Sequence, residues 1–206
     1  MLLEGRSPDG GQKIARVDKQ DSLLTHMALG QYYEQCAKGN VYIYQIASQA
    51  ILLSATTGAH ATVINQFGSG VNFVPLSLRL SWTSGTTVIG SVLIAATTKV
   101  SAVATGVGSP ILTATQAAPV NALIGSGNNP KTLWSPTVNT FTAAPTVIAA
   151  AGINLAPVDP ISGFVGETRF DGSLVFAPGS AMSIVYSVTT TTALFHLTII
   201  GMEVPV

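Results

Sequence analysis

The segment at 125–132 (GSGNNPKT) ends in Lys-Thr at the spacing of a loop that binds nucleotide phosphates. Such a loop needs a glycine directly before the lysine, because consecutive backbone amides must wrap around the phosphate groups. Pro130 occupies that position here, and proline has a fixed φ and no amide proton. We therefore predict a surface turn and no nucleotide site.

The residue types that bind metals are few and widely separated. The three histidines, His26, His60 and His196, share no spacing typical of zinc ligands. Cys36 is the only cysteine, which excludes an intrachain disulfide and a cysteine metal cluster. We expect no metal and no cofactor, ordinary strand or interface roles for the histidines, and a small apolar side chain in Cys36.

Acidic and basic residues alternate at Glu167, Arg169 and Asp171. In an extended segment all three would project on one face, with Arg169 between the acids. Two carboxylates can perform glycoside hydrolysis, but an acid, arginine, acid ladder is more typical of a salt-bridged rim. Ser69 lies between two glycines without the pattern of a hydrolase nucleophile. We therefore predict an interface ladder, no catalytic residue and no enzyme.

The two tryptophans raise the alternative of a glycan-binding platform. Trp82 continues the apolar face of a predicted strand at 74–82, in which Val74, Leu76, Leu78 and Leu80 alternate with more polar residues. Trp134 is therefore the only tryptophan that remains a candidate for an exposed platform that stacks on a sugar.

Charge is scarce and unevenly distributed. Charged residues make up 9% of the 206 residues and hydrophobic residues 47%, whereas about 25% of a typical soluble domain is charged. Nine basic and nine acidic residues balance to a formal net charge of zero, and ten of them lie in the first forty positions. The remaining chain has too few charges to coat a monomer, which favours assembly with other chains. No basic stripe follows, so we expect no direct contact with nucleic acid.

The apolar stretches of the sequence are too short for a signal peptide or a membrane-spanning helix. The start at 1–6 lacks the apolar stretch of a secretory signal. The most apolar windows, at 147–156 and 193–206, are interrupted before they reach the roughly 18 residues that cross a bilayer. We expect no signal peptide and no membrane contact.

The chain changes character near residue 40. Residues 1–20 are predicted to form an extended arm. Asp21 or Ser22 is a candidate N-cap for a short helix that follows, which would contain Leu23, Leu24, Met27, Tyr32 and Tyr33. Period-two patterns then predict strands at 41–46, 74–82, 86–97, 174–176, 182–188 and 195–200. Residues 98–160, rich in Ala, Thr, Pro and Gly, form a long insertion with short strands at 133–134 and 146–151.

These patterns predict a mainly β protein, an antiparallel β-sandwich or jelly roll with an extended N-terminal arm and a long inserted loop region. Residues 1–40 form the arm with its possible short helix. Residues 41–206 form the β-sandwich domain, with the insertion at 98–160.

Two segments and the C-terminal strand carry a family resemblance. The segments GQYYEQCAKGNV at 30–41 and NQFGSGVNFVPL at 65–76, with the ending IGMEVP at 200–205, resemble a group of tailed-bacteriophage virion structural proteins. Gln66 and Phe67 depart from the Pro-Ala usual in that group.

The resemblance implies a jelly-roll cement or decoration protein on the capsid surface of the virion. Its partner would be the major capsid protein, and it would be a homo-oligomer, commonly a trimer, with an N-terminal arm along the shell. The candidate capsid contacts in the arm are Arg6, Lys13, Arg16, Lys19, Tyr32 and Tyr33. The alternative is a tail, baseplate or host-receptor-binding virion protein whose insertion at 98–160 contacts host glycans.

Overall fold

The structure is a computed structural model that describes residues 4–6, 12–14, 32–49, 58–85, 90–97, 118–136, 139–140, 145–155, 165–187 and 194–206. The chain divides into two compact units, Met1–Lys38 and Gly39–Val206, here called the arm unit and the body. The division lies two residues before the predicted boundary between residues 40 and 41.

The arm unit contains a pair of short strands and one helix among its described residues. Strands β1 (Glu4–Arg6) and β2 (Gln12–Ile14) pair antiparallel, so part of the predicted extended arm has a strand partner. A two-stranded ribbon is at best marginally stable in water when it stands alone. Helix α1 (Tyr33–Ala37) contains Tyr33 of the helix predicted after Asp21 or Ser22, and positions 21–31 of that helix lie outside the described residues.

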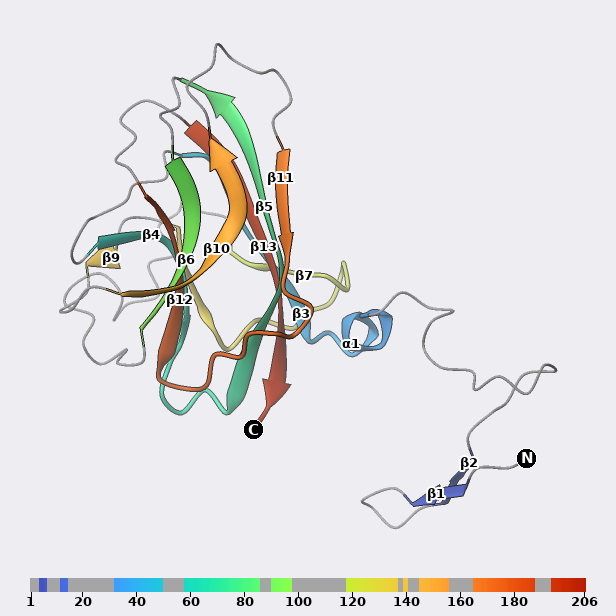
Figure 1. The fold of residues 1–206 in the computed structure, drawn as a ribbon. Helices are drawn as coiled ribbons and strands as arrows, with labels where there is room; N and C mark the ends of the chain where they lie inside the picture. The colour runs from blue at the N-terminus through green and yellow to red at the C-terminus, as the bar shows by residue number, and fades with distance from the viewer. Residues whose placement is uncertain are drawn as a thin grey trace. The chain divides into compact units, whose positions relative to one another are not determined.

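The body consists of two antiparallel sheets (Figure 1). The bounds of its strands are β3 Val41–Gln49, β4 Gly58–Asn65, β5 Val71–Ser84, β6 Gly90–Thr97, β7 Val120–Asn121, β8 Leu133–Ser135, β9 Asn139–Thr140, β10 Thr146–Leu155, β11 Val165–Arg169, β12 Ser180–Tyr186 and β13 Leu194–Pro205. The first sheet has the order β10-β6-β12-β4-β8, with β9 also paired to β4, and the second has the order β11-β5-β13-β3-β7.

The order of the eight longer strands is that of a jelly roll. Along the chain these strands alternate between the two sheets, except that β6 and β10 are neighbours in one sheet. Strand β13, the latest of them in sequence, lies between β3 and β5, as the two Greek keys of a jelly roll require. The predicted antiparallel β-sandwich of jelly-roll type is confirmed.

The long insertion lies in the connection between β6 and β10. It adds β7 to the outer edge of β3 and β8 to the outer edge of β4. The chain therefore covers one lateral side of its own sandwich. Both short strands predicted inside the insertion exist, but β10 is a full member of the first sheet, paired with β6. The part of the connection outside the main strands thus ends before Thr146.

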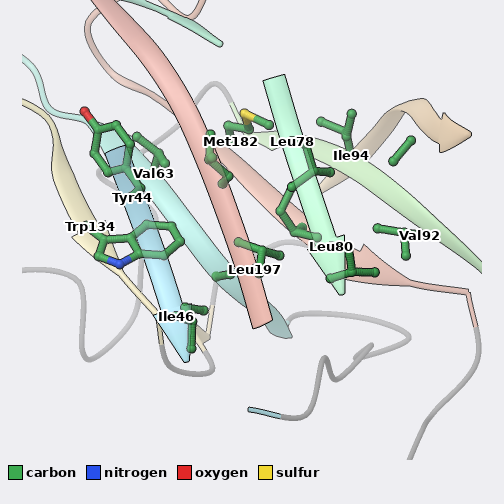
Figure 2. Packing of buried hydrophobic residues seen from close by; sticks show 14 of the residues in the cluster. Tyr44, Ile46, Val63, Leu78, Leu80, Val92, Ile94, Trp134, Met182 and Leu197 are labelled. Atoms are coloured by element: carbon green, nitrogen blue, oxygen red, sulfur yellow. The ribbon is translucent and has the colours of Figure 1, made fainter. Parts of the chain in front are cut away.

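One core lies between the sheets (Figure 2). Strands β5 and β13 supply Leu78, Leu80, Leu197 and Ile199 from one sheet, and all four are at most 1% exposed. The other sheet supplies residues that are equally buried, namely Val63, Ile94, Met182 and Ile184. The predicted alternation in β13 is confirmed, because Phe195, Leu197 and Ile199 are buried while the residues between them are partly exposed.

A bulge in β5 corrects the predicted apolar face of that strand. Ser77 pairs with Ile200 but Pro75 pairs with Gly201, so Leu76 is an extra residue in β5. The extra residue reverses the alternation, and Phe73 instead of Val74 joins Leu78 and Leu80 in the core. Leu174–Phe176, predicted as a strand, forms only an isolated bridge between Phe176 and Phe73.

The bulge places Gly201 directly against Phe73. Gly201 is buried, and a Cβ atom there would overlap the ring of Phe73, which is 0% exposed. The ring has little room to move, because it also packs edge-on against Tyr44 with ring centroids 5.6 Å apart. Only glycine fits this position without a shift of the core.

We therefore expect Gly201→Ala to lower the free energy of unfolding by about 1–3 kcal/mol, the usual cost of overpacking a core. Gly127→Ala is the matched control, because a Cβ there meets nothing within 4 Å. Urea denaturation of both variants measures the difference. Equal stability of the two variants would contradict the packing described here.

Candidate functional site

Several loops of the body converge at one end of the sandwich. The strand registers place Asn65 beside Ser180, Val71 beside Pro205, and Val41 beside Met202. We call this region the loop end and define it as residues 39–41, 65–71, 121–132, 170–180 and 202–206. It is the end to which the arrowhead of β13 points in Figure 1.

Asn65 holds together two of these loops. Its side chain is buried and donates to the carbonyl oxygens of Val71 and Phe176, both at 2.8 Å. It also accepts a 2.6 Å hydrogen bond from the hydroxyl of Ser69. A buried amide with its donors and acceptor satisfied stabilises a unique loop conformation. Asn65 therefore fixes the loops at 66–70 and 171–179 to each other.

Glu203 holds the 118–136 segment against the same end. Glu203 is 5% exposed and lies on the inward-facing side of β13. The backbone amides of Lys131 and Thr132 each donate to its Oε1 at 2.8 Å, and the Thr132 hydroxyl donates to the same oxygen at 2.8 Å. The amides that a phosphate-binding loop would offer to a nucleotide are thus used by the protein's own carboxylate. The predicted turn at 125–132 agrees with this arrangement.

Tyr44 extends this network into the core. Its hydroxyl lies 2.6 Å from Thr132 Oγ1, and since Thr132 donates to Glu203, Tyr44 is the donor to Thr132. Burial raises the pKa of Tyr44 well above that of an ordinary phenol, and the nearby Glu203 acts in the same direction. Tyr44 therefore keeps its proton and remains a hydrogen-bond donor.

Exposed apolar side chains cover the tips of the loop end. Phe67 is 65% exposed, Ile124 77% and Val175 59%. Phe67 also packs over Gly179, where a Cβ atom would overlap its ring, so the loops at 66–70 and 171–179 present one joint surface. These three residues carried no signal in the sequence, because an isolated apolar residue in a turn has no periodic neighbours.

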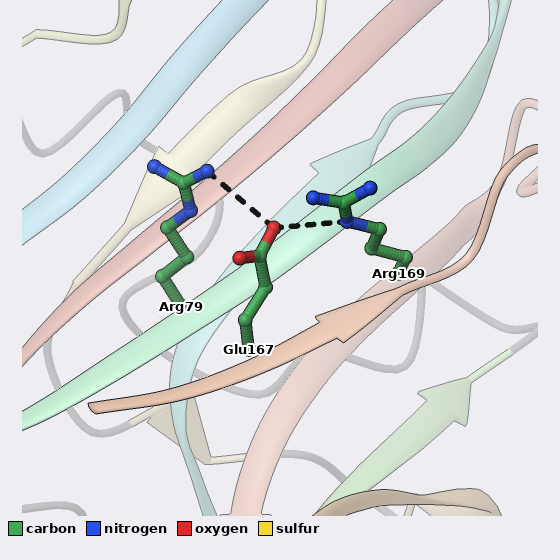
Figure 3. A network of polar contacts seen from close by, with 3 residues as sticks. All are labelled: Arg79, Glu167 and Arg169. Carbon is green, nitrogen blue, oxygen red and sulfur yellow. Dashed lines mark hydrogen bonds and ion pairs between the residues drawn. The ribbon is translucent and has the colours of Figure 1, made fainter. Parts of the chain in front are cut away.

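Two residues of the predicted ladder, Glu167 and Arg169, lie on β11 next to Arg79 of β5 (Figure 3). Glu167 Oε1 is 3.2 Å from Arg169 Nε and 3.4 Å from Arg79 Nη2. The sequence alone could not identify Arg79 as a member of this cluster. Only the pairing of β11 with β5 places Arg79 opposite Glu167. Asp171 lies beyond the end of β11, in a turn with φ of 46°.

The positive charges beside Glu167 affect its titration. Desolvation acts to raise the pKa of Glu167, but the hydrogen bonds and charges of Arg169 and Arg79 together outweigh it and lower the pKa. The three side chains are exposed, and exposed ion pairs contribute little to stability. The arrangement is a charged surface cluster with one more arginine than carboxylate.

Of the other predicted residues, Arg6 and Lys13 lie on paired strands, because the register places Lys13 opposite Gly5. Arg6 lies in β1, Lys13 in β2, and Tyr33 in α1, where it is 55% exposed, while Tyr32 precedes α1. Arg16, Lys19 and His26 lie outside the described residues, and of His60 only the backbone is described. His196 lies in β13 opposite Ser81. Cys36 is half-buried in α1, and burial raises the pKa of its thiol.

The described residues contain neither a metal-binding cluster nor a membrane-spanning helix. No group of three or more His, Cys, Asp or Glu in that part of the chain is placed to hold a metal ion. No helix there is long and apolar enough to cross a membrane.

Trp134, the candidate for an exposed sugar-binding platform, is buried. It is 6% exposed and belongs to the core. Its ring packs at 5.8 Å from that of Tyr44, and its Nε1 donates to the carbonyl oxygen of Gln45 at 3.3 Å. Strand β8 therefore uses Trp134 to close the side of the sandwich.

Residues 39–41, 65–71 and 202–205, which belong to the segments that resemble phage virion proteins, lie at the loop end. Asn65, Ser69 and Glu203 make the hydrogen bonds described above, and Gly39 accepts one from Asn121 Nδ2 at 2.7 Å. Gly68 and Gly70 have φ of 79° and 70°, which favours glycine. The departures from the pattern fall at Gln66 and Phe67, whose side chains make none of these contacts. Comparison with family models, curated proteins and solved structures finds no match.

Glu203→Ala leaves the amides of Lys131 and Thr132 without an acceptor, so we expect it to lower the free energy of unfolding by about 3 kcal/mol. Hydrogen exchange at the Thr132 amide should become faster in the folded protein. Glu167→Ala, which removes an exposed carboxylate, is the control and should cost less than about 1 kcal/mol. If denaturation gives both variants the same stability, Glu203 does not hold the 118–136 segment.

Proposed function

We propose that this chain is a structural protein of a tailed-phage virion that binds the capsid shell as a cement or decoration protein. The observation that carries the proposal is the exposure of a large apolar side chain on each of three loops of the loop end, Phe67, Ile124 and Val175. An exposed group of large apolar side chains on a folded domain is typical of a surface that contacts another protein.

The charges of the loop end fit a protein partner better than a charged polymer. Glu203 is buried there, and its carboxylate is used by Lys131 and Thr132. Among the described residues of the loop end, only Lys131 and Asp171 are both exposed and charged in their side chains. Such a surface favours burial against an apolar protein patch over electrostatic binding to nucleic acid.

The arm supports the same assignment. The chain enters the body at Gly39 and Asn40, at the loop end, where Glu203 N donates to the Asn40 carbonyl oxygen at 2.8 Å. Ten of the eighteen charged residues lie in positions 1–40, so the arm would supply polar contacts and the tips apolar ones.

The major capsid protein is the partner that this proposal names, with the chain acting as a homo-oligomer on the virion surface. The resemblance at 30–41, 65–76 and 200–205 supports it, as does a body with too little charge to coat a monomer. The alternative of a glycan-binding tail or receptor-binding protein has lost its main support, because Trp134 is in the core.

Deletion of residues 1–20 should abolish attachment to purified heads that lack this protein, because it removes β1, β2 and four of the candidate arm contacts. The body should stay folded, since its sheets contain no residue before Val41. Cosedimentation with heads measures attachment, and circular dichroism measures folding. Unchanged occupancy of the heads would refute attachment through the arm.

Phe67→Ser should weaken attachment of the full chain by about tenfold or more, because a phenyl ring buried in a contact contributes about 1.5–3 kcal/mol. Thr83→Ala is the control, an exposed position on β5 outside the loop end. The same cosedimentation assay, run as a titration, compares the two variants. Equal affinity would show that the loop end does not contact the shell.

A further inference from the structure

The two lateral sides of the sandwich are closed differently. On one side the edges are β7 and β8, with two and three residues. On the other side the edges are β11, with five residues, and β10, with ten. An edge strand exposes unpaired amide and carbonyl groups that can pair with another chain, so natural proteins protect such edges. Short length protects β7 and β8, and Glu167 and Arg169 protect β11.

Strand β10 has neither of these protections. Its sequence, TVIAAAGINL, contains no charged residue and no proline. Among the described residues it pairs only with β6, so its other edge has no strand partner in that part of the chain. Val147 is 51% exposed and Ile148 43%. The ladder with β6 shifts register twice, between Val147 and Ala149 and between Ala150 and Asn154. At the first shift Ile148 is an extra residue, and two neighbouring apolar side chains are exposed.

We propose that the open edge of β10 is an interface between two copies of this chain, with β10 of one copy paired antiparallel to β10 of the other. An open edge is satisfied by an extended backbone, which identifies the partner as a strand. An antiparallel pair of identical strands is self-complementary about a two-fold axis. Because β10 has no charge, the pairing brings no like charges together.

The composition of the body favours a second copy as the occupant. The 166 residues after position 40 contain only eight of the eighteen charged residues, so burial of an uncharged edge removes apolar surface from water at little electrostatic cost. Pairing through β10 would join the first sheets of two copies into one continuous sheet. A two-fold contact of this kind differs from the three-fold arrangement that the family resemblance implies.

The interface is tested on the purified full chain without capsids, so its outcome is independent of the proposed function. Sedimentation equilibrium should give a dimer, and Ile148→Lys should weaken the dimer by about tenfold or more, because two added lysines repel across the axis. Val147→Lys should act in the same direction. Val175→Lys, an exposed valine at the loop end, is the matched control and should leave the dimer unchanged.

A cross-link tests the geometry. In a Cys36→Ser background, which removes the only cysteine, Ile148→Cys should form a disulfide-linked dimer under mild oxidation and Val175→Cys should not. Circular dichroism of each variant verifies that it is folded. A monomer at all concentrations, a three-fold oligomer, or a dimer indifferent to Val147→Lys and Ile148→Lys would each overturn the proposal.

Discussion

The carboxylate of Glu203 is the constraint on which the arrangement of the body depends. It lies on the inward side of β13, where an unpaired charge would be costly, and its partners are amides from the far end of a long insertion. The segment that supplies these amides contains β7 before them and β8 after them, and the two strands extend the outer edges of β3 and β4. One buried charge thus organises the covered side and the loop end together.

The covered side leaves the molecule with two kinds of surface available to partners. At the loop end, hydrogen bonds of Asn65 and Glu203 hold the backbone, so the apolar tips at Phe67 and Val175 stand on a fixed support. A fixed support reduces the entropy lost when such side chains bind a partner. At the opposite lateral side, β10 offers backbone groups and β11 offers the cluster of Arg79, Glu167 and Arg169.

The regular strands were predictable from sequence because period-two alternation is a local property. Phe195, Leu197 and Ile199 show it in β13, and the fold class followed from several such strands. Val74 was assigned to the wrong face, because the bulge at Leu76 is a feature of the pairing with β13 and leaves no trace in the local alternation. Trp134 was misjudged for a similar reason: its burial depends on Tyr44. Glu203 could have been identified from the sequence as a buried charge. It continues the alternation of Phe195, Leu197 and Ile199, so it lies on the core side of β13.

The position of β13 has a consequence for how the protein forms. This strand makes the long central pairings of the second sheet, with β3 and β5, although it follows all other described strands in sequence. Until the ribosome has released it, β3 and β5 have no common neighbour, and their apolar faces remain open. Folding dominated by such distant pairings is slow and exposed to aggregation. The second sheet can therefore be completed only after β13 has emerged from the ribosome.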